Sequence, residues 1–226
     1  MIKRLAIIPA KGTSKRIKNK NLKQFHGKPL LFYPINAAKQ SKIFDKIHVS
    51  SESEKVLKYA NFLNIKTDFK RPKKLCHDKK GLFDVINFVV SEYEKMNYHF
   101  DEVWLLFTTN PFIKKKNILD CKKIFKKISY EKKNSLITVT KYNYPLEWAL
   151  KKERKKNLVP IQNKKIHLVS KKIKDLFCEA GMINVYSTKS LMNNADLKYF
   201  SYDLPLYESV DIDTIEDFEL AKRLFT

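Results

Sequence analysis

Glycine is scarce in this chain, with four residues among 226, and the glycine patterns of two large nucleotide-binding classes are missing. No glycine stands five positions before Gly12, so the Walker A spacing is absent, and no Gly-x-Gly-x-x-Gly occurs. These absences disfavour a P-loop kinase and a dinucleotide-dependent dehydrogenase.

Cysteine is also scarce, since Cys76, Cys121 and Cys178 are widely spaced and odd in number. Their spacing is not of a metal-binding type, and we expect reduced thiols in a cytoplasmic protein. No apolar run is long enough to span a bilayer, and Pro9, Lys11 and the charges that follow would interrupt a signal peptide. The sequence therefore predicts no membrane partner.

Acidic residues are outnumbered, with 24 Asp and Glu against 46 Lys and Arg and a net charge of +22. Such an excess of basic residues is typical of proteins that bind nucleic acid. The lysines concentrate, however, at 113–116, 122–127, 151–156 and 164–174, without a known nucleic-acid module or interleaved aromatic residues. We therefore expect no nucleic-acid partner, and a positive field that helps to collect small anionic substrates.

Strand and helix patterns alternate along the chain, which predicts an α/β fold with a largely parallel sheet. The expected strands are 5–9, 46–51, 65–69, 103–107, 135–140, 182–186 and 210–213, and the expected helices are 27–42, 54–63, 82–96, 117–128 and 214–224. The length favours one domain with a sizeable core. Residues 141–178 are rich in lysine and lack clear periodicity, so we interpret them as an excursion from that domain.

The loop after the first expected strand has the composition of a phosphate-binding turn. Gly12 permits a close backbone approach, small hydroxyls follow it, and Lys11, Lys15 and Lys20 supply positive charge. Successive backbone N–H groups in such a turn form an anion-binding concavity. The alternative is a surface loop in a lysine-rich protein.

A second candidate site is the pair Asp211 and Asp213. Two carboxylates two positions apart on a strand project to the same face, where their like charges need a cation. Mg²⁺ bound by one or two carboxylates and by substrate phosphates meets that need. The alternative is a helix start, with Asp213 as the cap and Glu216 and Asp217 placed favourably for the helix dipole.

Several separated motifs resemble the cytidylyltransferases that activate sialic-acid-like nonulosonic sugars. The stretch IIPAKGTSKRIKNKNL, residues 7–22, is similar to that family's I-I-P-A-R-G-G-S-K followed by K-N, with Lys11 for the usual Arg and Thr13 for the second Gly. Lysine cannot make the bidentate fork that arginine makes to phosphate. The stretch ESVDIDTIEDF, residues 208–218, is similar to the family's terminal motif, and the resemblance is weakest at 150–176.

The resemblance implies one Rossmann-like nucleotidyltransferase domain (GT-A-like) over residues 1–226, with the excursion at 141–178 serving a homodimer and covering the partner's sugar site. It implies that CTP and a nonulosonic acid react to give a CMP-sugar and pyrophosphate, for a surface glycan or for glycosylation of flagellin. It implies catalytic roles for Lys11, Lys15, Lys20 and Asp211, nucleotide contacts from Ala10, Gly12, Thr13, Ser14, Asn21, Arg71 and Asp78, sugar contacts from Phe107, Thr108, Thr109, Glu179 and Gly181, and Mg²⁺ binding by Asp211 and Asp213.

The sugar itself is left open by the sequence. Residues 107–112, 144–146 and 179–182 resemble the pseudaminic-acid branch more than the sialic-acid branch, although Met182 replaces a Gln. One alternative is a nucleotidyltransferase for another acidic sugar, such as 3-deoxy-manno-octulosonate. The other is a basic RNA-binding protein that keeps the fold without activity.

Overall fold

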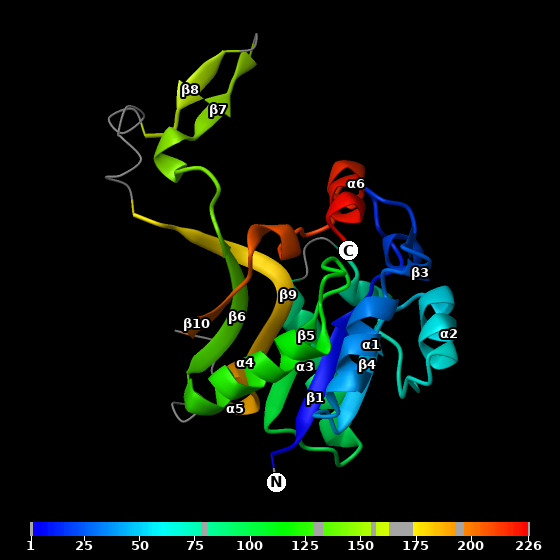
Figure 1. Cartoon of the computed structure of the whole chain (residues 1–226). Helices are drawn as coiled ribbons and strands as arrows, with labels where there is room; N and C mark the ends of the chain where they lie inside the picture. Colours follow the sequence, from blue (N-terminus) through cyan, green and yellow to red (C-terminus); the bar gives the residue numbers. More distant parts are fainter. Residues whose placement is uncertain are drawn as a thin grey trace.

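The fold is built on a six-stranded sheet with the strand order β10-β6-β9-β5-β1-β4 (Figure 1). The computed structural model describes residues 2–77, 81–128, 133–154, 157–162, 174–192 and 197–225. The strands are β1 (Arg4–Pro9), β4 (Lys46–Ser50), β5 (Glu102–Leu106), β6 (Asn134–Lys141), β9 (Phe177–Ser187) and β10 (Lys198–Asp203). All pairings are parallel except those of β9, which runs antiparallel to β5 and β6. The predicted α/β class with a mostly parallel sheet is confirmed.

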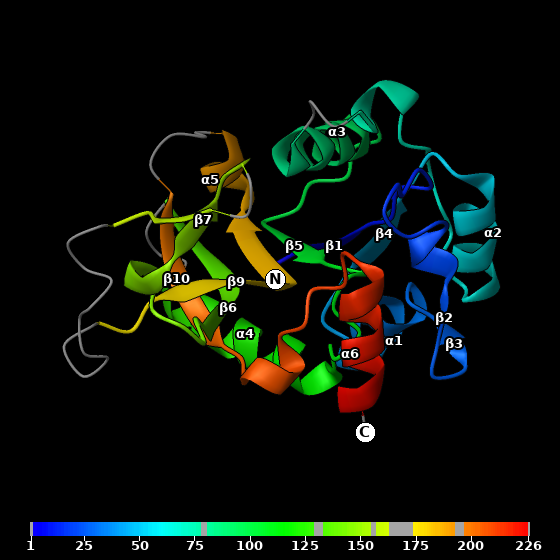
Figure 2. The same cartoon turned by 90° about the horizontal axis from the view of Figure 1, so that it is seen from above.

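Helices cover both faces of this sheet (Figure 2). The helices are α1 (Phe32–Ser41), α2 (Glu54–Phe62), α3 (Leu82–Lys95), α4 (Lys115–Ile128), α5 (Thr188–Met192) and α6 (Ile215–Leu224). Leu5 and Ile7 of β1 pack with α3, whereas Ala6 and Ile8 pack with α1 and α4. Because successive strand residues point to opposite faces, a strand covered on both sides must be apolar throughout, which explains the continuous apolar run in β1.

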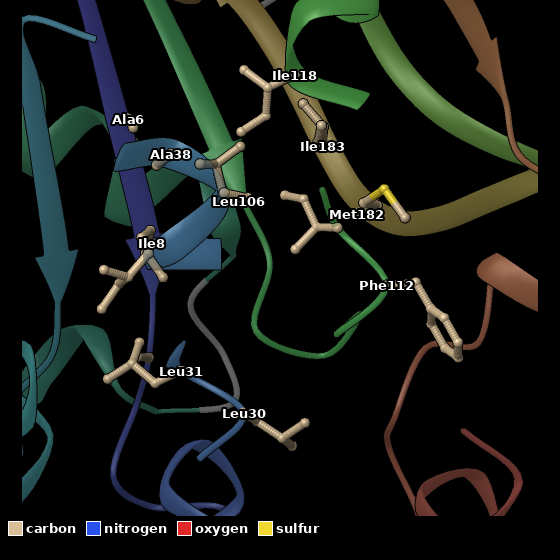
Figure 3. Packing of buried hydrophobic residues seen from close by; sticks show 14 of the residues in the cluster. Ala6, Ile8, Leu30, Leu31, Ala38, Leu106, Phe112, Ile118, Met182 and Ile183 are labelled. Carbon is tan, nitrogen blue, oxygen red and sulfur yellow. The ribbon is translucent and has the colours of Figure 1, made fainter. Parts of the chain in front are cut away.

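The larger core lies between the sheet and the layer of α1 and α4 (Figure 3). Ile8 and Leu106 from neighbouring strands meet Ala38 of α1 and Ile118 of α4, and each of these side chains is fully buried. Truncating a buried isoleucine such as Ile8 to alanine typically costs about 2–5 kcal/mol, because the cavity fills only partly. This packing fixes the ends of β1 and β5, where the candidate site lies.

The first expected helix is wrong at its start. It begins at Phe32, whereas Lys28–Pro29 forms a short strand, β3, that pairs with β2 (Gln24–Phe25). The turn between them has positive φ at both central residues, 43° at His26 and 76° at Gly27. Two such residues match the twist of a tight hairpin, so the turn excludes the helix.

Two expected strands are also wrong. Residues 65–69 pair with no strand, because the segment packs against the edge strand β4 through side chains: Phe69 stacks on His48 at 4.5 Å, and Asp68 pairs with Lys46 at 2.7 Å. Residues 210–213 form a loop before α6, and the last strand of the sheet is β10, which the sequence analysis did not predict. The helix expected to be capped by Asn117 begins at Lys115.

The segment between β6 and β9 leaves the body of the fold. In its described residues it holds a 3₁₀ turn (Leu146–Trp148) and the short hairpin of β7 (Leu150–Lys152) and β8 (Leu158–Pro160), which stands away from the sheet in Figure 1. Across the described ranges, none of the helices is both long enough and apolar enough to cross a membrane.

Candidate active site

A cleft of about 480 Å³ opens at the carboxyl ends of β1, β4 and β5, where open α/β sheets bind ligands. It is lined by Pro9, Lys11, Ser14, Lys15, Arg16, Ile17, Lys20, Asn21, Arg71, Thr108, Thr109 and Asp213. A volume of this size suits one small-molecule ligand. The structure thus brings together the three predicted catalytic lysines, three of the seven residues predicted to contact the nucleotide and one of the two predicted metal ligands.

The loop after β1 is tied to the ends of the neighbouring strands. The N–H of Ala10 donates to the carbonyl of Ser50 at 2.9 Å. Asn21, which is 4 % exposed, donates from Nδ2 to the carbonyl of Lys11 at 2.8 Å and accepts from the hydroxyl of Thr108 at 2.6 Å. Both ends of the Asn21 amide therefore hold the loop in place, and the group keeps one further proton and one lone pair for a ligand.

Gly12 is needed for packing inside the protein. A Cβ added to it would lie 2.5 Å from Cβ of Ser53, the residue that precedes α2. Its N–H donates to Oε1 of Glu52 at 2.8 Å, so a carboxylate of the chain takes one of the donors expected to meet phosphate. Burial alone would raise the pKa of Glu52, but hydrogen bonds with Cys76 and Gly12 and the charge of Arg71 hold it below its ordinary value.

Arg71 is almost fully buried at the wall of the cleft. Its guanidinium donates to the hydroxyl of Ser50 at 3.1 Å and to the carbonyl of Ser50 at 2.7 Å. Arg71 therefore fixes the end of β4, and its charge reaches the cleft from a rigid position.

Asp213 is held by two cations. Lys20 Nζ lies 2.9 Å from Oδ1 and also donates to the carbonyl of Ile212 at 2.8 Å, while Arg16 Nη2 lies 2.7 Å from Oδ2. Partial burial alone would raise the pKa of Asp213, but the hydrogen bonds and charges of Lys20 and Arg16 hold it below its ordinary value. Asp213 is therefore ionised at neutral pH.

Asp211 is set differently. Part of its side chain is open to solvent, but the burial of its carboxylate among protein atoms raises its pKa. The charges of Asp213 and Asp217 raise this pKa further, and a hydrogen bond from Thr109 acts in the opposite direction. A Cβ on Gly181, whose φ is 55°, would lie 3.1–3.2 Å from that carboxylate, so only glycine fits there without strain. Ile212 between them is fully buried, whereas Asp211 is exposed and Asp213 is partly exposed.

These two carboxylates fit a hard divalent cation. Asp211 has no salt-bridge partner within the described residues, although the charge of Lys20 favours its ionised form, and both side chains offer oxygen donors of the kind that Mg²⁺ prefers. No group of three or more His, Cys, Asp or Glu residues that could hold a metal ion is found in the described ranges. Asp211 and Asp213 could therefore supply part of a coordination shell, with phosphates and water completing it. The helix-start alternative assigned the cap to Asp213, but Thr214 is the N-cap of α6, in a capping box with Asp217.

The residues expected to contact the sugar are spread more widely. Thr108 and Thr109 line the cleft, and Gly181 adjoins Asp211. Phe107 instead packs, half-buried, against the α3 layer, and Glu179 is exposed on β9 with Oε1 accepting from Asn184 at 2.7 Å. A sugar role for Phe107 and Glu179 stays a prediction.

The nucleotide set is also incomplete. Ala10 is fully buried behind the loop, and Thr13 lines a smaller neighbouring cavity of about 330 Å³ with Lys15, Glu52 and Cys76. Asp78 lies outside the described residues.

Sequence reasoning missed three side chains that shape the site. They are Arg16, Glu52 and Asn110, whose buried amide donates to the carbonyls of Ala180 and Glu208 at 3.2 and 3.0 Å. Arg16 could have been found from its place in the cationic loop. The contacts of Glu52 and Asn110 depend on the tertiary fold and leave no local signal.

Comparisons with known proteins give a consistent result. A family model described as cytidylyltransferase matches residues 5–224. The chain is 32 % identical over 227 residues to the pseudaminic acid cytidylyltransferase of Campylobacter jejuni, covering 99 % of this chain and 97 % of that protein. It is 29 % identical to the CMP-N,N'-diacetyllegionaminic acid synthase of Legionella pneumophila, over 97 % of this chain and 95 % of that one.

Among solved structures, the fold is similar to that of a CMP:2-keto-3-deoxy-manno-octonic acid synthetase complexed with CTP, with a TM-score of 0.71, 14 % identity and 98 % of each chain covered. It is also similar to the 4-diphosphocytidyl-2C-methyl-D-erythritol synthase of Anaerococcus prevotii, with a TM-score of 0.60, 14 % identity and coverage of 98 % of this chain and 97 % of that one. At this identity the likeness concerns the fold alone.

Proposed function

Because the chain belongs to the cytidylyltransferase family, we propose that it joins CTP to a sialic-acid-like nonulosonic acid, giving a CMP-sugar and pyrophosphate. The observation that carries the proposal is the arrangement of the cleft: the cations of the β1 loop and the acid Asp213 line one cavity at the carboxyl ends of the strands. A cavity with that charge distribution suits a triphosphate accompanied by a metal ion.

In this proposal the anomeric hydroxyl of the sugar attacks the α-phosphorus of CTP in line, a new P–O bond forms, and pyrophosphate leaves. The residues of the chain do little covalent chemistry and act by positioning and by neutralising charge. Lys11, Lys15 and Lys20 bind the phosphates from the loop side. Lys20 does this from a fixed place, because Asp213 and the carbonyl of Ile212 hold its ammonium.

Asp211 and Asp213 would hold Mg²⁺, with Thr109 orienting Asp211 and Lys20 orienting Asp213. When bound there, Mg²⁺ neutralises phosphate charge and makes the attacking hydroxyl more acidic. The absence of a Cβ at Gly181 leaves room for the Asp211 carboxylate.

We assign base choice to Asn21 and the backbone of residues 10–14, and sugar choice to the residues that follow β5 and to Gly181. Asn21 retains one donor and one acceptor beyond its structural bonds, which is what a pyrimidine edge requires. The support for sugar contacts from Thr108, Thr109 and Gly181 is that the two threonines line the cleft and that Gly181 adjoins Asp211. A pseudaminic-type acid is our first choice, because the likeness to the Campylobacter jejuni protein extends over nearly the whole of both chains.

We further propose that residues 1–226 work as one catalytic domain and that two copies pair through the excursion at 141–178. Large apolar side chains are exposed on the described part of the excursion, with Tyr144 at 71 %, Ile161 at 65 % and Leu158 at 53 %. Burying them against a second copy would remove this apolar surface from water. The three free cysteines suit a reducing compartment, so we place the reaction in the cytoplasm, as a supply step for a surface glycan or for flagellin glycosylation.

The test of the proposed function is pyrophosphate release with CTP across a panel of nonulosonic acids and 3-deoxy-manno-octulosonate. The other three nucleoside triphosphates serve as controls. We expect release that requires CTP, Mg²⁺ and one nonulosonic acid together. Salt-sensitive RNA binding without pyrophosphate release would favour the non-catalytic alternative.

A further inference from the structure

Two cations occupy both carboxylate oxygens of Asp213, and they are anchored to very different degrees. The Lys20 side chain is 14 % exposed and has a second partner in the carbonyl of Ile212, whereas the Arg16 side chain is 64 % exposed. Moving Lys20 would break two interactions and uncover a buried ammonium. Moving Arg16 would release an exposed ion pair, which is typically worth less than about 1 kcal/mol.

We propose that Arg16 is a movable positioning residue, which covers Oδ2 of Asp213 until the phosphates of an incoming nucleotide draw it away. The inference rests on the proposed function, since it concerns how the same site receives nucleotide and metal. Lys20 stays in place in both states, and Arg16 exchanges one anion for another.

The phosphate that would draw Arg16 away from Asp213 would bind in the same cleft. Arg16 lines the same cavity as Lys11 and Lys15, so a phosphate bound by those lysines lies within the surroundings of the guanidinium. Arg71, the other guanidinium lining this cleft among the described residues, is 5 % exposed and bonded to Ser50. Arg16 is therefore the guanidinium there that can reorient, and its planar fork matches phosphate oxygens, which the ammonium of Lys11 does not.

The exchange makes nucleotide and metal binding depend on each other. While Arg16 occupies Oδ2, Asp213 is a poor ligand for Mg²⁺, because the cation must compete with an ion pair of 2.7 Å. Once Arg16 moves to phosphate, the oxygen becomes available beside Asp211. Coupling of this kind is reciprocal, so metal at Asp213 also favours the phosphate-bound position of Arg16.

The first experiment titrates Mg²⁺ alone into nucleotide-free protein by calorimetry, with Mn²⁺ as a paramagnetic probe. We expect Arg16→Gln to bind the metal about two- to five-fold more tightly than the parent, the range that corresponds to loss of an exposed ion pair. Lys18→Gln is the matched control, because Lys18 is exposed on the same loop and is not among the residues that line the cleft. Equal metal affinity in Arg16→Gln and Lys18→Gln, or no metal binding by either, overturns the inference.

The second experiment measures CTP affinity in EDTA, in a double-mutant cycle of Arg16→Gln and Asp213→Asn. We expect Asp213→Asn to tighten CTP binding in the parent. In the Arg16→Gln background the same substitution should tighten binding by a factor at least about two-fold smaller, because the effects of coupled neighbours are not additive. Additive effects overturn the inference. Neither readout needs turnover: missing pyrophosphate release would count against the proposed function, while normal release with additive binding would count against Arg16 alone.

Discussion

Gly12 lies so close to Ser53 that a Cβ added to Gly12 would sit 2.5 Å from Cβ of Ser53. The loop that follows β1 is thereby docked onto the residues that begin α2, and Glu52 accepts a hydrogen bond from the Gly12 N–H at 2.8 Å. The glycine of this loop is required first by the protein's own packing. Any role toward a ligand is additional to that.

The first prediction separates these two needs. Gly12→Ala should destabilise the protein by about 1–3 kcal/mol, because the added methyl group overpacks the contact with Ser53. Adding Ser53→Gly should restore most of the stability, since the Ser53 side chain makes no capping hydrogen bond and glycine at an N-cap costs only a few tenths of a kcal/mol. Thermal or urea unfolding of both variants is the measurement.

Gly81→Ala is the control for packing in that series, because the nearest contact of its added Cβ is Asp84 Oδ2 at 4.0 Å, so any loss of stability there comes from the N-cap of α3. A single Gly12→Ala variant as stable as the parent would contradict the packing account. If the double variant regains stability but keeps a raised KM for CTP, the glycine also serves the nucleotide.

The second prediction concerns base choice. Asn21→Ala should weaken the preference for CTP over the other nucleoside triphosphates while leaving sugar preference nearly unchanged, because a site that loses a base partner discriminates less. Thr108→Val removes the bond of 2.6 Å to Asn21 Oδ1 but keeps the Asn21 side chain, and it serves as the matched variant for nucleotide preference. Competition assays with mixed nucleotides and mixed sugars measure both preferences.

Two outcomes of that assay differ in meaning. If Thr108→Val lowers the CTP preference as much as Asn21→Ala does, Asn21 acts by holding the loop. If Asn21→Ala alters sugar selection and leaves nucleotide selection intact, the proposed division of the cleft is wrong.

The third prediction tests pairing through the excursion. The parent should sediment as a dimer, and Leu158→Asp combined with Ile161→Asp should give a monomer with reduced activity, because charges replace exposed apolar contacts. Phe62→Asp is the control: Phe62 is 77 % exposed but lies on α2, outside the excursion, so this variant should remain a dimer. A fully active parent that is monomeric at working concentration would reject the dimer.

The fourth prediction follows from a buried histidine that is not among the residues lining the cleft. The Tyr93 hydroxyl donates to Asp68 at 2.8 Å, so it accepts from Nδ1 of His48 at 3.1 Å, and Nε2 of His48 has no partner in the described part of the chain. Burial lowers the pKa of His48 to about 4. The charges of Lys46 and Arg71 act in the same direction, and the charge of Asp68 acts against them.

The sign of the effect follows from proton binding. Between the unfolded pKa of about 6.5 and the folded pKa of about 4, the unfolded chain binds more protons, so the free energy of unfolding falls as pH falls through this window. The loss from this one group is at most about 3 kcal/mol. His48→Phe should flatten the dependence of unfolding free energy on pH between these limits, and an unchanged slope would contradict the assignment.

The sequence predicted the parts of the fold that depend on local pattern. After their first residues, Arg4 and Glu102, the buried strands β1 and β5 are apolar because helices cover both faces, and the helices α2 and α3 keep their amphipathic spacing. The sequence could not predict β10, which is almost entirely exposed and is held by backbone pairing with β6. The hairpin at His26 and Gly27 was missed because its turn lacks the usual Asn-Gly signal.

The candidate site shows the same division. The lysines of the first loop and the acids at 211 and 213 were found from motifs, and the structure places Lys20 directly on Asp213. The strand assigned to those acids was wrong, and the structure has a loop there, in which a buried Ile212 separates the exposed Asp211 from the partly exposed Asp213. The contact of Glu52 with Gly12 brings together distant segments, so no local pattern could have predicted it, whereas the place of Arg16 in the cationic loop was a signal that the sequence did offer.

The central claim is that this cleft transfers a cytidylyl group with the help of Asp211 and Asp213. The most direct measurement quantifies pyrophosphate and CMP-sugar together, with CTP, Mg²⁺ and a pseudaminic-type acid, for the parent and for Asp211→Asn and Asp213→Asn. We expect equal amounts of the two products from the parent, and turnover lower by at least about 10²-fold in each folded variant, the scale on which loss of one electrostatic contact to a transition state acts. Turnover without Mg²⁺, pyrophosphate without a CMP-sugar, or both variants working at the parental rate would contradict the account.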